Sequence, residues 1–328
     1  MSFFSVLFAL LLEQARPLKR HNPVHDGVRA YVGWVSQNFH AGKSGHDGLA
    51  WSLAVGVPAL LTWLIYGLLH SYVGWLAAMV WSVATLYITL GFRQFSFHFS
   101  QIRDALARGD EDLARELLAD WQQSRTNHLT KSDVLQRVSA LSILAAHRHV
   151  FGVLTWYCLL AMLGLGPMGA VIYRLSEFVA RDRPHSSPDS LQDPSRSQQE
   201  TANRLWRRVD WLPARVTAIS FALVGNFEPV ADVWRSGQFQ DDNDGLIVAA
   251  ASSALGLQFG PQSAAAPRVS TADATSSQSE SAEGSSQPHD ALEAPEFSHL
   301  ALIVGLVWRT VVLWMLLLAL LTFSYLLG

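Results

Sequence analysis

Long uncharged apolar stretches alternate with polar stretches along this chain. Residues 49–69 and 72–92 contain no charged residue, and only His70 and Ser71 separate them. A helix of about 20 apolar residues, rising 1.5 Å per residue, crosses a hydrocarbon core of roughly 30 Å. The pattern therefore predicts two membrane-spanning helices in a tight hairpin, with their outer ends on the same side of the membrane.

Three further apolar segments have the same character. Residues 300–327 form the longest run, interrupted only by Arg309, and predict a C-terminal transmembrane helix. Residues 3–15 form an N-terminal segment that we interpret as retained, because its first basic residue follows the apolar run. Residues 150–173 are uncharged but contain a Gly-Pro break near 164–169, so they form either a kinked span or a re-entrant pair of half-helices.

The segments between the apolar runs are rich in basic residues. Residues 16–48 and 93–149 join the ends of the predicted hairpin, and the positive-inside rule places them in the cytoplasm. Residues 174–260 are also basic, which favours the re-entrant interpretation of the broken segment. Amphipathic stretches at 211–227 and 246–260 suit packing on or in the membrane. The expected fold class is an all-α, polytopic membrane protein with a helical cytoplasmic portion.

Composition shifts suggest three regions. We expect residues 1–263 to form one membrane domain and residues 300–327 to form a separate membrane helix. Residues 264–296 are dominated by Ala, Ser, Thr, Pro and acidic residues, and contain few large apolar groups. Such a segment cannot bury enough apolar surface to offset its ordering entropy, so we expect a disordered linker.

Overall composition excludes several classes of function. Half of the residues are apolar and 16% are charged, against about 25% in typical soluble proteins. The net charge of −3 gives no reason to expect a nucleic-acid partner, and the single cysteine, Cys158, excludes an internal disulfide. Phosphate-binding glycine loops and the usual hydrolase and metalloprotease signatures are absent from the sequence. Any chemistry must therefore come from polar groups beside the membrane segments.

Two histidine-containing motifs are candidate sites. His21 and His25 have the spacing of a helical metal site, but Pro23 disfavours a helix at Asn22, so a polar loop is the expectation. The run His147-Arg148-His149 stands at the mouth of the glycine-rich break. A cation cluster there can hold a phosphate or a carboxylate, whereas the alternative is ordinary positive charge flanking a membrane segment.

A third candidate is the segment from Arg207 to Arg215. Asp210 and Arg215, with Pro213 between them, can pair with one another or bind a ligand from a defined turn. The alternative is the start of an interfacial helix with proline in its first turn.

A fourth candidate is the acidic run Asp241-Asp242-Asn243-Asp244. The three carboxylates Asp241, Asp242 and Asp244 can hold Mg²⁺, which prefers a few carboxylates together with phosphate oxygens. The alternative is a helix N-cap, since acidic groups favour that end of a helix.

Several of these segments resemble one known family. VDWLPARVTAISFAL resembles the D-x-x-P-A-R-L-T segment of the CobD/CbiB family of cobalamin-biosynthesis membrane proteins. DNDGLIVAAASSALGLQFG is similar to that family's S-P-N-A-G…A-G-A-L-G-L segment, and GLGPMGAVIYRLSEF to its glycine-rich stretch. ALARGDEDLAREL and HNPVHDGVRAYVGWV resemble two earlier motifs, and all five occur in the family's order. AmpE-like membrane proteins share the same skeleton.

The resemblance implies an amide ligase of the adenosylcobinamide-phosphate synthase type. Such an enzyme joins a corrinoid carboxylate to aminopropanol or its phosphate in an ATP-dependent step, with Mg²⁺, in the inner membrane. It implies substrate-binding roles for Asp210, Arg215 and Asn243, which match shared motif positions, while no residue is assigned as catalytic. Membrane lipid is the other expected partner.

Departures from the family's motifs leave a second interpretation open. The family's G-R-D-T motif is reduced here to Arg125 and Thr126, and its E-N-x-x-D cluster is replaced by residues 147–151, HRHVF. Carboxylates that would bind a metal or an amine have become cations or an aromatic residue. The alternative is therefore a non-catalytic, AmpE-like sensor or regulatory protein with a remodelled site.

Overall fold

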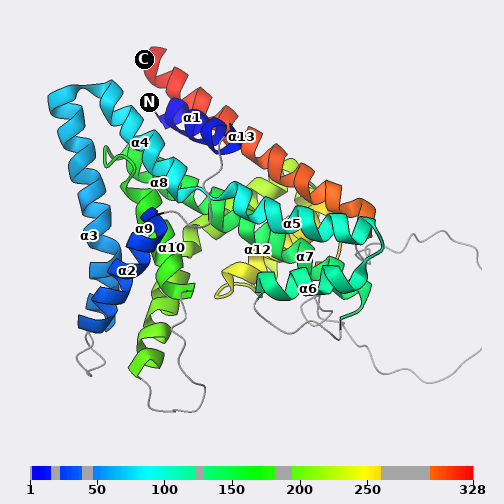
Figure 1. The fold of residues 1–328 in the computed structure, drawn as a ribbon. Coiled ribbons are helices and arrows are strands. Elements are labelled where there is room, and N and C mark those ends of the chain that lie inside the picture. The colour runs from blue at the N-terminus through cyan, green and yellow to red at the C-terminus, as the bar shows by residue number, and fades with distance from the viewer. Residues whose placement is uncertain are drawn as a thin grey trace, which may run out of the picture.

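The computed structural model describes residues 2–15, 23–38, 47–122, 129–181, 194–259 and 296–327. Throughout these ranges the regular elements are helices, accompanied by one isolated bridge residue, which confirms the predicted all-α class (Figure 1). The linker predicted at 264–296 lies outside the described residues, apart from Glu296.

Within the described residues, three helical stretches are long and apolar enough to cross a membrane. They are Asp47–Val73, Lys131–Met162 and Phe297–Ser324, and two shorter apolar helices cover Phe3–Ala15 and Trp75–Thr89. The polytopic character predicted from the sequence is thereby confirmed.

The first predicted hairpin is present. Helix α3 (Asp47–Leu68) continues through a π-helical turn, η1 (Leu69–Val73), and returns as α4 (Trp75–Thr89). Gly74 closes the turn with φ of 110°, a backbone conformation that glycine adopts without steric cost.

The Gly-Pro break of residues 150–173 separates two helices. Helix α8 (Gly152–Met162) ends at a turn, and α9 (Met168–Arg181) packs back against it. Gly164 and Gly166 both have positive φ in this turn, which explains why the apolar run cannot continue as one helix. The segment is thus a helical hairpin rather than a single kinked helix.

Helix α8 is also the second half of a longer helical stretch that begins before it in the sequence. Helix α7 (Lys131–Ala146) joins it through the π-helical turn η2 (His147–Phe151). In the most apolar window of this long stretch, 78% of the residues are buried inside the protein. It is therefore the central helix of the fold, and its polar residues must be satisfied by other parts of the protein.

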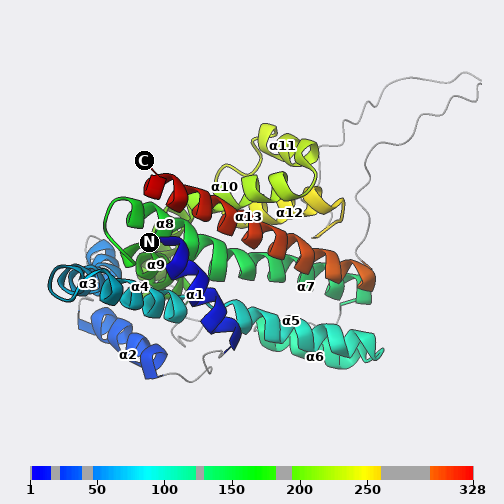
Figure 2. The same ribbon diagram turned by 90° about the horizontal axis from the view of Figure 1, so that it is seen from above.

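Several helices pack around this central one. Figure 2 shows α5 (Phe92–Ala107) and α6 (Glu111–Gln122) on one side of α7, with α11 (Phe227–Arg235) and α12 (Asn243–Leu255) on the other. A turn at Gly109, with φ of 77°, separates α5 from α6.

The two ends of the chain and the longest helix complete the bundle. Helix α10 (Pro194–Val224) contacts α8, α9 and α12, and contains the first part of the amphipathic stretch predicted at 211–227. Helices α1 (Ser2–Ala15) and α13 (Leu300–Leu327) contact one another, and α2 (Pro23–Asn38) lies against α3 (Figure 1).

Close backbone approach fixes the second hairpin. A Cβ added at Gly169 on α9 would lie 2.0 Å from the backbone carbonyl oxygen of Trp156 on α8. A Cβ at Gly166 would lie 2.6 Å from the ring of Tyr66, so the turn of this hairpin lies beside α3. The two hairpins are therefore packed together near their turns.

We expect Gly169→Ala to destabilise the protein by about 1–3 kcal/mol, because the added methyl group forces α8 and α9 apart. Gly305→Ala on α13 is the matched control, since a Cβ there meets nothing within 4 Å. Thermal unfolding in detergent checks this, and equal midpoints for the two variants would contradict the hairpin packing.

Candidate functional site: a buried basic cluster

Three consecutive basic residues lie inside the protein, in the π-helical turn η2. His147 is fully buried and Arg148 is 8% exposed. Successive residues on a helix point in different directions, since about 3.6 residues complete a turn. Each of the three side chains therefore needs its own partner, and π-helical turns of this kind often mark functional sites.

His147 contacts an aspartate from α10. Its Nε2 lies 2.9 Å from Asp210 Oδ1, and its Nδ1 lies 2.9 Å from the hydroxyl oxygen of Thr217. The hydroxyl of Tyr173 on α9 donates to the same Asp210 oxygen at 2.8 Å. Burial opposes ionisation of Asp210, but His147 and these hydrogen bonds outweigh it and lower the pKa of the carboxyl. Asp210 therefore links the central helix to both α9 and α10 as a carboxylate.

One oxygen of this aspartate is unused. Asp210 Oδ2 is buried and has no hydrogen-bond partner among the described residues. A buried acceptor without a partner is unusual in proteins and points to a missing donor.

Arg148 points to the start of α12. Its Nη2 forms a short ion pair with Asp244, whereas its buried Nε has no hydrogen-bond partner in the described part of the chain. The cluster at 147–149 and the acidic run at 241–244, both singled out in the sequence, therefore belong to one site.

His149 points to α9. Its Nδ1 lies 2.8 Å from Arg174 Nη1, and Arg174 also pairs with Glu177. Arg181 Nε lies 3.5 Å from the other Glu177 oxygen. Glu177 lies outside the three candidate membrane spans. Burial alone would raise the pKa of its carboxyl, but Arg174 and the other nearby basic groups lower that pKa to about 2.

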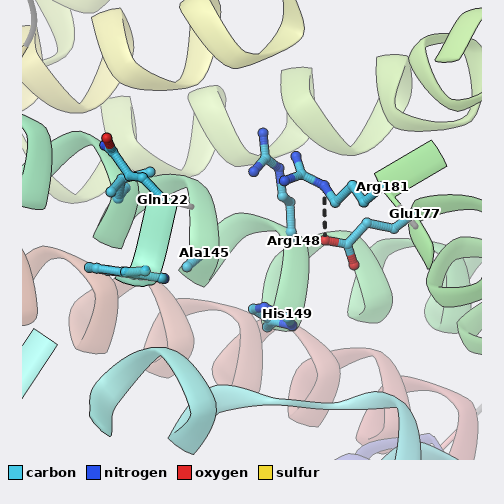
Figure 3. A pocket seen from close by; sticks show the side chains of 8 residues that line it. Gln122, Ala145, Arg148, His149, Glu177 and Arg181 are labelled. Atoms are coloured by element: carbon cyan, nitrogen blue, oxygen red, sulfur yellow. Dashed lines mark ion pairs between the residues drawn. The ribbon is translucent and has the colours of Figure 1, made fainter. Parts of the chain in front are cut away.

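A cavity of about 370 Å³ opens beside this cluster. Figure 3 shows Arg148, His149, Glu177 and Arg181 at one end and Gln122 and Ala145 at the other. Its full lining also includes Trp121 from α6 and Leu141 from α7. The cavity therefore has a charged end and a largely apolar end.

Arg215 and Asn243 hold the start of α12 against α10. Arg215 Nη1 donates to Asn243 Oδ1 at 3.3 Å, and its Nη2 donates to the carbonyl of Gln240 at 3.0 Å. The amide of Asn243 in turn donates to the carbonyl of Arg207 at 2.9 Å. Asn243 precedes Asp244, so these residues position the partner of Arg148.

The acidic run does not fit a magnesium site. Asp242 caps α12 by accepting from the backbone N–H of Gly245 at 2.9 Å, as the N-cap alternative predicted. Asp244 pairs with Arg148, and Asp241 is exposed. No group of three His, Cys, Asp or Glu side chains suited to a metal occurs within the described ranges.

Other predicted residues lie beyond what the structure describes. His21, Arg125 and Thr126 fall outside the described residues, as does the side chain of His25. Helix α2 begins at Pro23, the first-turn position that proline tolerates.

Five polar residues of the site stand in no candidate motif of the sequence. They are Tyr173, Arg174, Glu177, Arg181 and Thr217, and each contacts the basic cluster or lines the cavity. A signal existed in α9, where Arg174, Glu177 and Arg181 share one face of a helix at three- and four-residue spacing directly after an apolar half.

In a helical membrane protein with several apolar spans, a charged network beside a cavity is a candidate functional site. Residues 6–286 match the family described as CobD/Cbib protein. The chain therefore belongs to the CobD/CbiB family of cobalamin-biosynthesis proteins.

Two curated relatives agree with this family. The chain is 29% identical over 270 residues to a protein of Stutzerimonas stutzeri named cobalamin biosynthesis protein CobD, covering 79% of this chain and 82% of the relative. It is 32% identical over 181 residues to the protein of that name from Chromobacterium violaceum, covering 54% of each chain. No solved structure matches the chain.

The pKa of Glu177 predicts a pH dependence of stability. Because the folded value is about 2 and the ordinary value 4.5, this group stabilises the fold fully above pH 4.5 and less as the pH falls toward 2. We expect Glu177→Gln to cost about 3 kcal/mol near pH 6, and the difference from the wild type to shrink between pH 5 and pH 2.

Thermal unfolding in detergent across this pH range tests the prediction. Glu228→Gln, at an exposed position of α11, serves as the control and should follow the wild-type profile. A constant difference between Glu177→Gln and the wild type at all pH values would refute the role of the ion pairs.

Proposed function

We propose that this protein is an inner-membrane amide ligase of cobalamin biosynthesis. It would join a corrinoid carboxylate to aminopropanol or its phosphate, as the synthases that it resembles do. Its membership of the family and the names of its two relatives support the pathway. The basic segments between the apolar runs support a cytoplasmic orientation of the large loops.

The observation that carries the proposal is that separate motifs meet at the basic cluster beside one cavity. Asp210, Arg215 and Asn243 match family motif positions. Asp210 on α10 contacts His147, while Arg215 and Asn243 hold the start of α12, whose Asp244 pairs with Arg148. These segments are far apart in the sequence, yet their side chains form one network beside a cavity of about 370 Å³.

The charged end of the cavity suits the chemistry of an acid–amine ligation. Arg148 and Arg181 can hold an anionic substrate group, and Glu177 can face the substrate's amine. ATP would supply the energy for activating the carboxylate, and Mg²⁺ would bind to the phosphates of ATP. We assign no metal-ligand role to Asp242 or Asp244 in this proposal, because Asp242 caps α12 and Asp244 pairs with Arg148.

A specific observation favours a second function. The carboxylates of Asp210 and Asp244 contact His147 and Arg148, so side chains of the protein itself take the place of a metal or a substrate amine. An AmpE-like sensor or regulatory protein with this remodelled, non-catalytic site is therefore the alternative.

We expect Arg215→Lys to abolish rescue of a bacterial strain that lacks its own synthase. Arg215 contacts Asn243 and the carbonyls of Trp211 and Gln240 at once, and a single ammonium cannot reproduce this forked geometry. The loss should be at least tenfold in corrinoid product, with unchanged protein in the membrane fraction.

Arg235→Lys, at an exposed ion pair on α11, is the matched control and should rescue fully. Failure of the unmutated protein to rescue, with expression verified, would refute the ligase and leave the regulatory alternative.

A further inference from the structure

The C-terminal helix α13 carries a single charged side chain. Arg309 is the only charged residue between positions 300 and 327, and it is exposed on the outer surface of the helix. It forms no ion pair with the residues that the structure describes. A charged side chain on a membrane helix is costly unless it is paired, so Arg309 needs an anionic partner from outside the described part of the chain.

Arg309 divides α13 into two parts with different surroundings. Before α13, the short turn η4 (Phe297–His299) contacts α5, which carries the exposed ion pair of Arg103 and Asp104. Figure 1 shows the start of α13 beside the end of α5 that turns into α6. The second part, residues 310–327, contains no charged residue and is about 27 Å long at 1.5 Å per residue. This length alone approaches the roughly 30 Å of a hydrocarbon core.

The surroundings of Arg309 on the helix suit a membrane boundary. Side chains on a helix lean toward its N-terminal end, so the guanidinium of Arg309 extends toward the preceding turn. Gly305 lies in that turn, and a Cβ added there would meet nothing within 4 Å, so the space beside it is open. Trp308, next to Arg309, is 40% exposed, and tryptophan favours the membrane–water interface.

A second copy of the chain does not offer the missing anion through its apolar helices. Residues 49–69, 72–92 and 150–173 contain no carboxylate, and Glu13 on α1 is only 6% exposed. A phospholipid, by contrast, presents a phosphate group at the membrane boundary. The planar guanidinium fork of arginine matches two phosphate oxygens, so a lipid phosphate suits Arg309 in both charge and geometry.

We propose that Arg309 binds the phosphate of an anionic membrane phospholipid and marks the level at which α13 enters the hydrocarbon core. The phosphate lies beside Gly305 and Trp308, and an acyl chain lies along Val312 and Leu316, which are exposed on the same face of the helix. The part of α13 that crosses the core is then the segment after Gly305. The site is separate from the cavity, so the inference does not rest on the proposed function.

Cysteine accessibility tests the position of the boundary. Leu302→Cys and Val312→Cys, each combined with Cys158→Ser, are compared because these side chains are 45% and 55% exposed and lie about 15 Å apart along the helix. A membrane-impermeant maleimide is applied to membrane fragments that are open on both sides. We expect Leu302→Cys to react about tenfold faster or more, since water does not reach the hydrocarbon core. Equal reaction rates at the two positions, with full labelling of both after denaturation, overturn the boundary.

Native mass spectrometry of the full-length protein, titrated with phosphatidylglycerol, tests the lipid. We expect Arg309→Gln to weaken binding of the first phosphatidylglycerol about fivefold or more, because a neutral amide lacks the charge-assisted hydrogen bonds. Gly305→Leu keeps the charge but fills the space beside it, and should weaken binding as well.

Arg235→Gln is the matched control for the charge, because this exposed arginine lies on α11 and pairs with an acid of its own helix. It should bind phosphatidylglycerol as the wild type does. Excess inorganic phosphate should leave the lipid bound, since the acyl chain also contributes to binding. Equal phosphatidylglycerol binding by the wild type, Arg309→Gln and Gly305→Leu overturns the proposal.

Discussion

Three adjacent basic side chains inside a membrane protein impose the constraint around which this fold is organised. A buried charge or polar group is costly unless it is paired, and His147, Arg148 and His149 point in three directions from the central helix. Their partners come from α10, α12 and α9, respectively. The pairing therefore fixes how four separate parts of the chain pack, and it places the cavity where they meet.

The second helical hairpin separates this cluster from the packed turns. The turns of the two hairpins lie together where Gly166 meets Tyr66. The 11 residues of α8 separate the basic cluster from its turn, a distance of about 16 Å at 1.5 Å per residue. The cluster therefore lies at the far end of α8 from the turns, where the central helix meets α9, α10 and α12.

Much of the fold follows from the sequence because charge and apolar length are properties of single segments. The α3–α4 hairpin, the break before Gly169 and the turn at Gly109 are local features, and all three are present. The central helix was less predictable, since α7 carries enough polar residues to resemble a cytoplasmic amphipathic helix. Only its burial by the surrounding helices shows that it joins α8 as one long element.

The sequence identifies several residues of the site, but it does not show which of them contact one another. The sequence marks Arg148 and Asp244 as separate candidates, and no local rule joins positions 96 residues apart. Asp242 fits a metal ligand and a helix cap equally well by residue type, and only the contact with Gly245 distinguishes them. Tyr173 and Thr217 look like ordinary members of apolar helices until their hydroxyls meet Asp210 and His147.

The buried pair of His147 and Asp210 ties the central helix to α10. A double-mutant cycle on the free energy of unfolding in detergent, with His147→Gln, Asp210→Asn and the double variant, measures this coupling directly. We expect a coupling energy of about 1–3 kcal/mol, with the double variant less destabilised than the sum of the single variants. Strictly additive effects would contradict it.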